Sequence, residues 1–163
     1  MLKLTKKADY GLIALKHLAV NSPASSSAKE IAETYGIPAA LLSKILQKLV
    51  KSGFLRSEHG TNGGYKLARD PREITAYEVI RTIDGPIFLT ACFTEHGYCV
   101  HTDKCTVRDP LQKVHEGILR LLANISISDM SADSSKTESK PEDETGKSAP
   151  RLYDVSITPP TTM

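Results

Sequence analysis

Residues 27–67 constrain the fold of this chain most, because they place two short helices and a hairpin in direct succession. Ser27 and Glu30 stand at the spacing of a capping box, which begins a helix, and Gly36 can end that helix in the left-handed conformation. A second helix is expected over residues 38–52, with proline in its first turn. Two helices joined by so short a turn predict a helix-turn-helix.

The helix expected over residues 38–52 is amphipathic, with a leucine- and isoleucine-rich inner face. Two short strands follow, at 54–57 and 65–68, separated by the glycine-rich turn 59–64. A β-hairpin directly after the second helix is typical of a wing. The sequence therefore predicts a mostly α fold with a small β-hairpin wing, which is a winged helix-turn-helix.

Three further helices are expected: one near residues 5–20, one over 75–84 that opens with a second capping box of Thr75 and Glu78, and one that begins at Asp109. Asp109 and Pro110 suit the beginning of the last one, whose wide apolar stripe favours packing on a partner subunit. The expected organisation is a DNA-binding domain over 1–84, a cysteine-bearing loop over 85–107, a dimerisation helix and its end over 108–130, and a disordered tail over 131–163, where serine, threonine, proline and charged residues predominate.

Charge is distributed unevenly along the chain. Residues 1–70 hold eleven Lys or Arg against five Asp or Glu, whereas the whole chain has a net charge of only +2. A basic N-terminal part favours a polyanionic partner such as double-stranded DNA. No stretch is apolar enough to span a membrane or to form a signal peptide, so a cytoplasmic protein is expected. No catalytic constellation stands out, and we expect no enzyme.

A DNA-reading role assigns particular side chains to the second helix and the wing. Outward residues near the beginning of a recognition helix meet base edges, while outlying cations and the wing meet phosphates or the minor groove. The candidates for base edges are Ala40, Ser43, Lys44 and Gln47; those for phosphates are Lys48, Lys51, Arg56 and Lys66; those at the wing tip are His59, Asn62 and Gly63.

All three cysteines lie within fourteen residues, at Cys92, Cys99 and Cys105. An odd, tightly spaced set argues against a disulfide framework and favours metal or redox chemistry. Thiolates are the usual ligands of iron–sulfur clusters, and these gaps are longer than those of most zinc knuckles. Zinc with His96 or His101 as fourth ligand, and redox-active thiols, are the alternatives.

Several blocks of the sequence resemble the Rrf-two family of regulators, to which IscR and NsrR belong. They are LTKKADYGLIAL, KEIAETYGIP, GTNGGYKLA, ITAYEVIRTIDGP and the three-cysteine loop, which together cover residues 1 to about 130. CFTEHGYC and CTVRDPLQKVHEGILRLL look most like the regulators of SUF-type iron–sulfur assembly operons. The resemblance implies a homodimer with a dimerisation helix over about 108–124, a 2Fe–2S or 4Fe–4S cluster, and control of promoters, here as a repressor.

The resemblance also frames the question of the fourth cluster ligand. IscR-like members have a histidine three residues after the last cysteine, where this chain has Arg108, which cannot ligate. NsrR-like members place an aspartate ligand from the other subunit at the position of Asp9, so Asp9 joins His96 and His101 as a candidate. His59 stands where many members have arginine. A nitric-oxide sensor of the NsrR kind and a zinc-stabilised DNA-binding module are the alternative functions.

Overall fold

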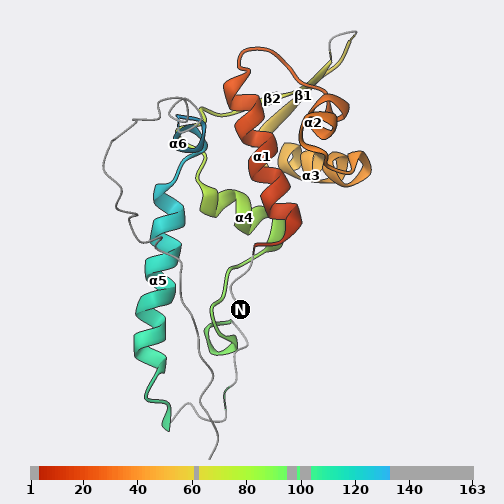
Figure 1. Ribbon diagram of the computed structural model, residues 1–163. Helices are drawn as coiled ribbons and strands as arrows, with labels where there is room; N and C mark the ends of the chain where they lie inside the picture. The colour runs from red at the N-terminus through yellow and green to blue at the C-terminus, as the bar shows by residue number, and fades with distance from the viewer. Residues whose placement is uncertain (1–3, 61–62, 95–98, 100–103, 133–163) are drawn as a thin grey trace, which may run out of the picture.

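The computed structural model describes residues 4–60, 63–94, 99 and 104–132, so the candidates Asn62, His96 and His101 lie outside the described residues. Figure 1 shows a helical molecule with one β-hairpin. The elements are α1 (Lys6–Val20), α2 (Ala28–Tyr35), α3 (Ala39–Lys51), β1 (Leu55–Glu58), β2 (Gly64–Leu67), α4 (Ala76–Asp84), η1 (Ala91–Phe93), α5 (Arg108–Asn124) and α6 (Ile127–Ala132). The predicted fold class, a winged helix-turn-helix with a long additional helix, is confirmed.

Local hydrogen bonds explain where the first helices begin. The Thr5 hydroxyl accepts from the Ala8 N–H at the beginning of α1. Both predicted capping boxes are present, at Ser27 before α2 and at Thr75 before α4, and Gly36 ends α2 with a φ of 62°. Burial raises the pKa of Glu78 in the second box, but the Thr75 N–H and the charge of Arg69 outweigh burial and leave the pKa below its ordinary value.

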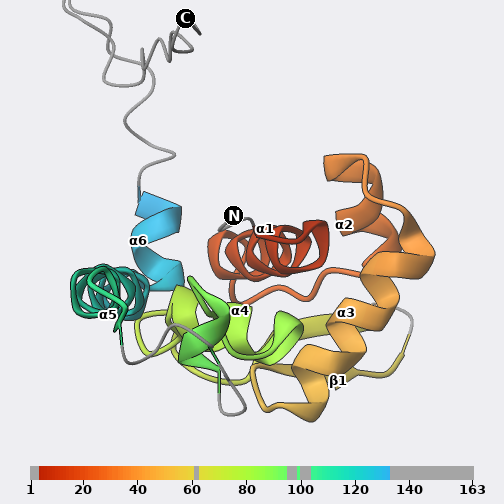
Figure 2. The same cartoon turned by 90° about the horizontal axis from the view of Figure 1, so that it is seen from below.

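The core surrounds α1, which packs against α3, α4 and α6 (Figure 2). The apolar side chains that face inward from these helices leave almost no surface to solvent, as the predicted inner face of α3 requires. They include Ala14, Leu15 and Leu18 of α1, Leu42, Ile45, Leu46 and Leu49 of α3, Val79 and Ile80 of α4, and Ile127 of α6.

The wing consists of β1, β2 and the turn between them. Its strands are antiparallel, with Leu55 opposite Leu67 and Arg56 opposite Lys66. Two backbone hydrogen bonds between Ser26 and Tyr65 also attach the loop after α1 to β2. The wing is therefore joined to the helical core at two places in the sequence.

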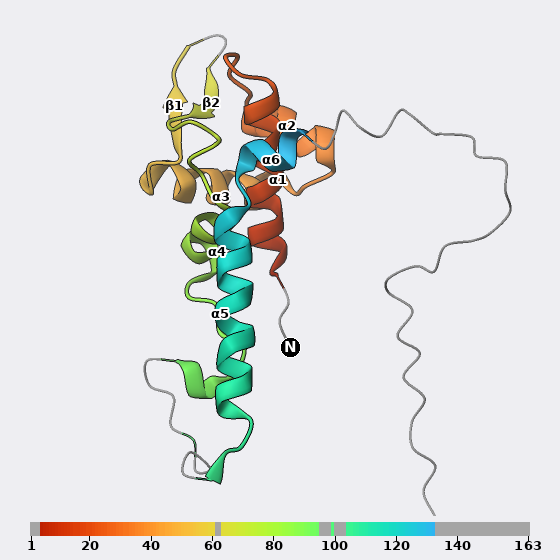
Figure 3. The same ribbon diagram turned by 90° about the vertical axis from the view of Figure 1, so that its left-hand side faces the viewer.

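α5 has the range of about 108–124 that the resemblance implies, but its N-cap and the helix after it differ from the sequence expectation. α5 begins at Arg108, with Val107 rather than Asp109 as its N-cap, and the Val107 side chain makes no capping hydrogen bond. α5 lies on the side of the molecule opposite α3 and extends beyond the other helices (Figure 3). A further short helix, α6, was not expected, and it ends at Ala132, inside the range assigned to the tail. Residues 133–163 lie outside the described part.

α6 completes the core. The Ala76 N–H donates to the Ile125 carbonyl at 2.8 Å, and the Ile127 N–H donates to the Ile74 carbonyl at 2.9 Å. These bonds lead the chain from α5 back to the beginning of α4, where the Ile127 side chain is fully buried. The pattern of residues 125–132 is too short for its periodicity to reveal a helix, which is why the sequence did not predict it.

We expect Ile127→Ala to lower the free energy of unfolding by about 2–5 kcal/mol, because it opens a cavity in the core between α6 and α1. Chemical denaturation of the full chain measures this loss. The matched control is Val20→Ala, which shortens a side chain that is 59% exposed and should change stability by less than about 0.5 kcal/mol. Equal stability of the two variants would show that α6 does not belong to the core.

Candidate nucleic-acid interface and cysteine segment

The outer face of α3 carries the predicted base-reading residues. Ala40, Lys44 and Gln47 are exposed, Ser43 is half-buried, and Lys51 continues the same stripe one turn further on. α3 contains three lysines and no acidic residue, so the helix carries a net positive charge. The structure thus places the predicted readers together on one accessible face, which is what insertion into a major groove requires.

Lys48 differs from its neighbours on α3. Its Nζ donates a hydrogen bond to the backbone carbonyl oxygen of Ile83, in the last turn of α4, at 3.0 Å. The ammonium group that the sequence offered to a phosphate is therefore already bonded to another helix.

The two cations of the wing share one acidic partner. Glu58 lies 2.8 Å from Lys66 Nζ and 3.8 Å from Arg56 Nε. The two cations are register partners on facing strands, so Glu58 offsets the repulsion between them. Phosphate contacts by Arg56 or Lys66 must compete with this carboxylate. His59 is exposed and Gly63 half-buried at the described edges of the turn.

Sequence reasoning missed a polar contact that holds the wing. His17 of α1 hydrogen-bonds through Nε2 to the Ser26 hydroxyl at 3.1 Å and through Nδ1 to the Tyr35 hydroxyl at 3.3 Å. Ser26 is 2% exposed and is bonded through its backbone to Tyr65 of β2. The sequence showed only that His17 is a polar residue on a partly buried side of α1, which does not identify the residues it bonds.

The cysteine segment, residues 85–107, links α4 to α5. All three cysteines are half-buried, and a hydrogen bond joins Cys92 Sγ and Thr90 Oγ1 at 3.0 Å. Phe88 and Phe93 stack on the His115 ring of α5, with centroids 6.4 and 5.3 Å apart. The described beginning of the segment is thus anchored to the N-terminal half of α5.

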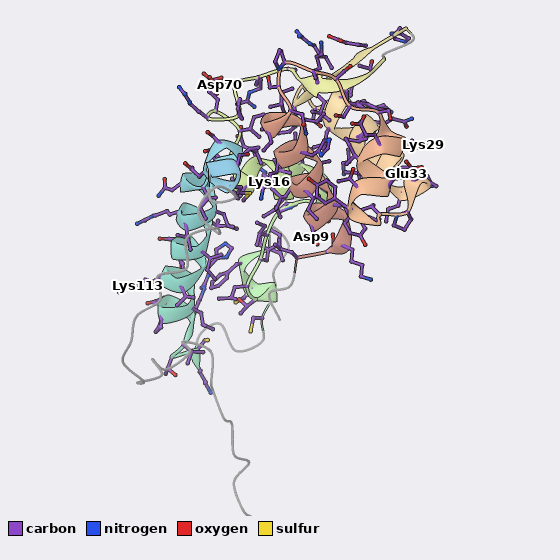
Figure 4. The ribbon with its side chains drawn as sticks, turned by 45° about the horizontal axis from the view of Figure 1, so that its top comes forward. Asp9, Lys16, Lys29, Glu33, Asp70 and Lys113 are labelled. Carbon is purple, nitrogen blue, oxygen red and sulfur yellow. The ribbon has the colours of Figure 1, made fainter. Side chains whose placement is uncertain are left out.

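Asp9 lies in the first turn of α1 and is exposed (Figure 4). Among the described residues its carboxylate has no hydrogen-bonding or ionic partner. Within the described part of one chain, no three His, Cys, Asp or Glu side chains lie close enough together to hold a metal ion. Asp9 and the three cysteines therefore form no closed ligand set within the described residues of a single chain.

The chemistry of the donors nevertheless fits an iron–sulfur cluster. Three thiols on one connecting segment offer three soft ligands, and their partial burial limits access of water. An exposed carboxylate such as Asp9 is available to a second chain.

α3, which carries the predicted base-reading residues and three lysines, is the reader helix. Together with the attached wing it defines a winged helix-turn-helix DNA-binding protein, a transcription regulator rather than an enzyme. Residues 4–133 match the Rrf2 family, the Rrf-two family named above, whose description is iron-dependent transcriptional regulator. The chain belongs to this family. Regulators of this family bind DNA and are often dimeric. No helix in the described residues is long and apolar enough to cross a membrane.

Similar proteins include several named transcription regulators. The chain is 34% identical over 134 residues to the HTH-type transcriptional regulator NsrR of Geobacillus kaustophilus, covering 81% of this chain and 91% of that one. CymR, the global cysteine regulator of B. subtilis, has a TM-score of 0.72 at 26% identity, covering 82% and 98% of the two chains. T. potens IscR has a TM-score of 0.67 at 29% identity, covering 85% and 93%.

We expect Glu58→Gln to strengthen binding to every DNA duplex and to leave sequence preference unchanged, because it releases Arg56 and Lys66 for phosphates. Fluorescence anisotropy with two unrelated duplexes at several salt concentrations measures both properties. Glu116→Gln makes the same charge change on α5, away from the reader face, and should have little effect. A gain confined to one of the two duplexes would contradict this role of Glu58.

Proposed function

We propose that this chain is a cytoplasmic, iron–sulfur-sensing repressor of a SUF-type iron–sulfur assembly operon. The observation that carries the proposal is the position of Cys92, Cys99 and Cys105. All three lie on the segment that joins the DNA-binding domain, residues 1–84 and here called the reader domain, to α5. The sequence resemblance described above supports the choice of operon. The iron-dependent description of the family supports the choice of cofactor.

Cys92, Cys99 and Cys105 would hold the cluster, and Asp9 of a second chain would supply the fourth ligand. Two observations support Asp9: its exposure and its lack of a hydrogen-bonding or ionic partner among the described residues. A carboxylate binds iron more weakly than a thiolate does, which suits a ligand that must be released on a signal. When bound, the cluster supplies a redox- and iron-dependent link between the two chains.

A homodimer through α5 is part of the proposal. Val107, Val114 and Leu121 recur every seven residues at this end of the chain and are 51–63% exposed, although all three are apolar. α5 contains no fully buried residue, and it packs on its own chain mainly through α4. Such a stripe is what two helices bury when they pair.

A nitric-oxide-sensing repressor is the second candidate, favoured by the 34% identity to a regulator named NsrR. The two candidates share the cluster and the DNA interface and differ in the signal. The cluster-loaded protein on DNA is treated either with nitric oxide or with an iron chelator. Release of DNA at the lower dose of nitric oxide supports the nitric-oxide sensor, and release at the lower dose of chelator supports the iron–sulfur sensor.

Replacing any one of the three cysteines with serine should abolish or strongly deplete the cluster, since each removes a thiolate ligand. Iron and acid-labile sulfide analysis and visible absorption after anaerobic purification measure the loss. Thr106→Ala, next to Cys105 and exposed, is the matched control and should retain the cluster. A colourless wild-type protein with stoichiometric zinc would replace this proposal with a zinc-stabilised module.

The DNA interface is tested by two substitutions on α3. Gln47→Ala should cost about 1–3 kcal/mol at the preferred base and little elsewhere, because glutamine bonds a base edge in two places. Lys51→Ala should weaken all sequences alike and reduce the salt dependence of binding. Binding to a selected duplex and to its single-base variants distinguishes the two. An interchange of these two results would reverse the assigned roles.

A further inference from the structure

Two other helices are bonded to the C-terminal turn of α4. Lys48 of α3 donates from Nζ to the Ile83 carbonyl oxygen at 3.0 Å, across 35 residues of sequence. Thr5, immediately before α1, donates from its hydroxyl to the Asp84 carboxylate at 2.6 Å, across 79 residues. These are long-range polar bonds between different elements, and both end on the last two residues of α4. The three helices therefore meet at one point.

The contact of Lys48 suits its chemistry. The last carbonyl groups of a helix lack intrahelical partners and carry partial negative charge, so an ammonium group there is stabilised. A small groove of about 170 Å³ opens at this point, lined by Lys7, Leu41, Lys44, Ile45, Lys48 and Ile83. Half of these side chains are lysines, so the carbonyl end of α4 lies in basic surroundings.

The same turn is also fixed by apolar packing. Ile83 is 8% exposed and lies over Gly11 of α1, where a Cβ atom would collide with Ile83 Cδ1. Ile45 of α3 is the next neighbour of Gly11, at 3.6 Å from that Cβ position. α3 thus contacts this region through a side chain in the core and through the Lys48 hydrogen bond at the surface.

The position of this turn in the chain gives it a further role. Asp84 is the last residue of α4, and Gly85, with a φ of 87°, begins the cysteine segment. Farther along, Phe88 and Phe93 stack on His115 of α5. The end of α4 is therefore the place where the cysteine segment leaves the DNA-binding domain, and Lys48 bonds α3 to that same turn.

We propose that Lys48 is a positioning residue that fixes α3 to the end of α4, and that through this contact the state of the cysteine segment sets the affinity of α3 for DNA. The second half rests on the proposed cluster-sensing function. The positioning role of Lys48 does not rest on it, because that role follows from the hydrogen bond between Lys48 and Ile83 alone. The sequence had suggested a phosphate contact for Lys48 instead.

The test compares Lys48→Met, which keeps the aliphatic stem and removes the donor, with Lys51→Met, which removes the same charge one turn away. Lys48→Arg retains a donor and serves as the conservative variant. Full-length proteins, with and without the cluster, are titrated with a duplex selected from a random library by the wild-type protein. Affinity is measured over a range of KCl concentrations, and thermal unfolding confirms that each variant is folded.

Two quantities are expected to separate the variants. A plot of log affinity against log salt has a negative slope, and its magnitude should decrease by about 0.9 in Lys51→Met, which loses one phosphate contact. In Lys48→Met the slope should keep the wild-type value. An allosteric signal typically changes a binding affinity by about 5- to 150-fold. In Lys48→Met alone, the ratio of DNA affinities with and without the cluster should shrink to about twofold or less. Lys48→Arg should restore the ratio.

A slope that falls by about 0.9 in Lys48→Met would make Lys48 a phosphate contact and overturn the positioning role. An unchanged affinity ratio in Lys48→Met would overturn the route through α4, whatever the slope. A wild-type protein that takes up no cluster, or binds DNA equally with and without it, shows instead that the cluster-sensing function is wrong. In that case the salt slope alone decides the role of Lys48.

Discussion

The close approach of α4 to α1 at Gly11 sets the position of nearly everything else. A side-chain carbon at Gly11 would displace Ile83, and Ile45 of α3 lies at ordinary contact distance from the same point. The surrounding large apolar side chains are almost fully buried, each worth roughly 1.5–3 kcal/mol relative to exposure. Because protein interiors are close-packed, α3 and α4 cannot shift independently against α1. The reader helix α3 and the end of α4, where the cysteine segment begins, therefore both pack on the same part of α1.

Much of the fold was predictable because its signals are local. Capping boxes, the positive φ of Gly36 and the inner face of α3 are each determined within a few residues, and all were found as expected. The bounds of α5 match the helix that the family resemblance implies, but Asp109 lies in the first turn and Val107 at the cap, because Asp and Pro suit either place. α6 was missed although Ser126 and Asp129 exchange capping hydrogen bonds at its beginning, because a helix of six residues is too short to show a period.

The candidate site divides in the same way. Exposure of the outer face of α3 follows from its amphipathic pattern, so the predicted readers were found on one face. Partners distant in sequence were not predictable: Lys48 with Ile83, Glu58 between two wing cations, and His17 with Ser26. Each depends on where a second element lies, which no local pattern encodes. The proposed fourth ligand, Asp9 of a second chain, likewise depends on an element that no local pattern encodes.

The return of the chain through α6 also limits how this protein can be rearranged in evolution or in the laboratory. Ile127 fills the core beside α1 and α4, although more than forty residues separate it from the end of the reader domain at Asp84. A fragment cut after α4 would leave an apolar cavity open to water. The DNA-binding domain therefore cannot be moved into another protein as residues 1–84 alone. A chimera that exchanges the cysteine segment must keep residues 125–132 with the DNA-binding domain and insert the foreign sequence between α4 and α6.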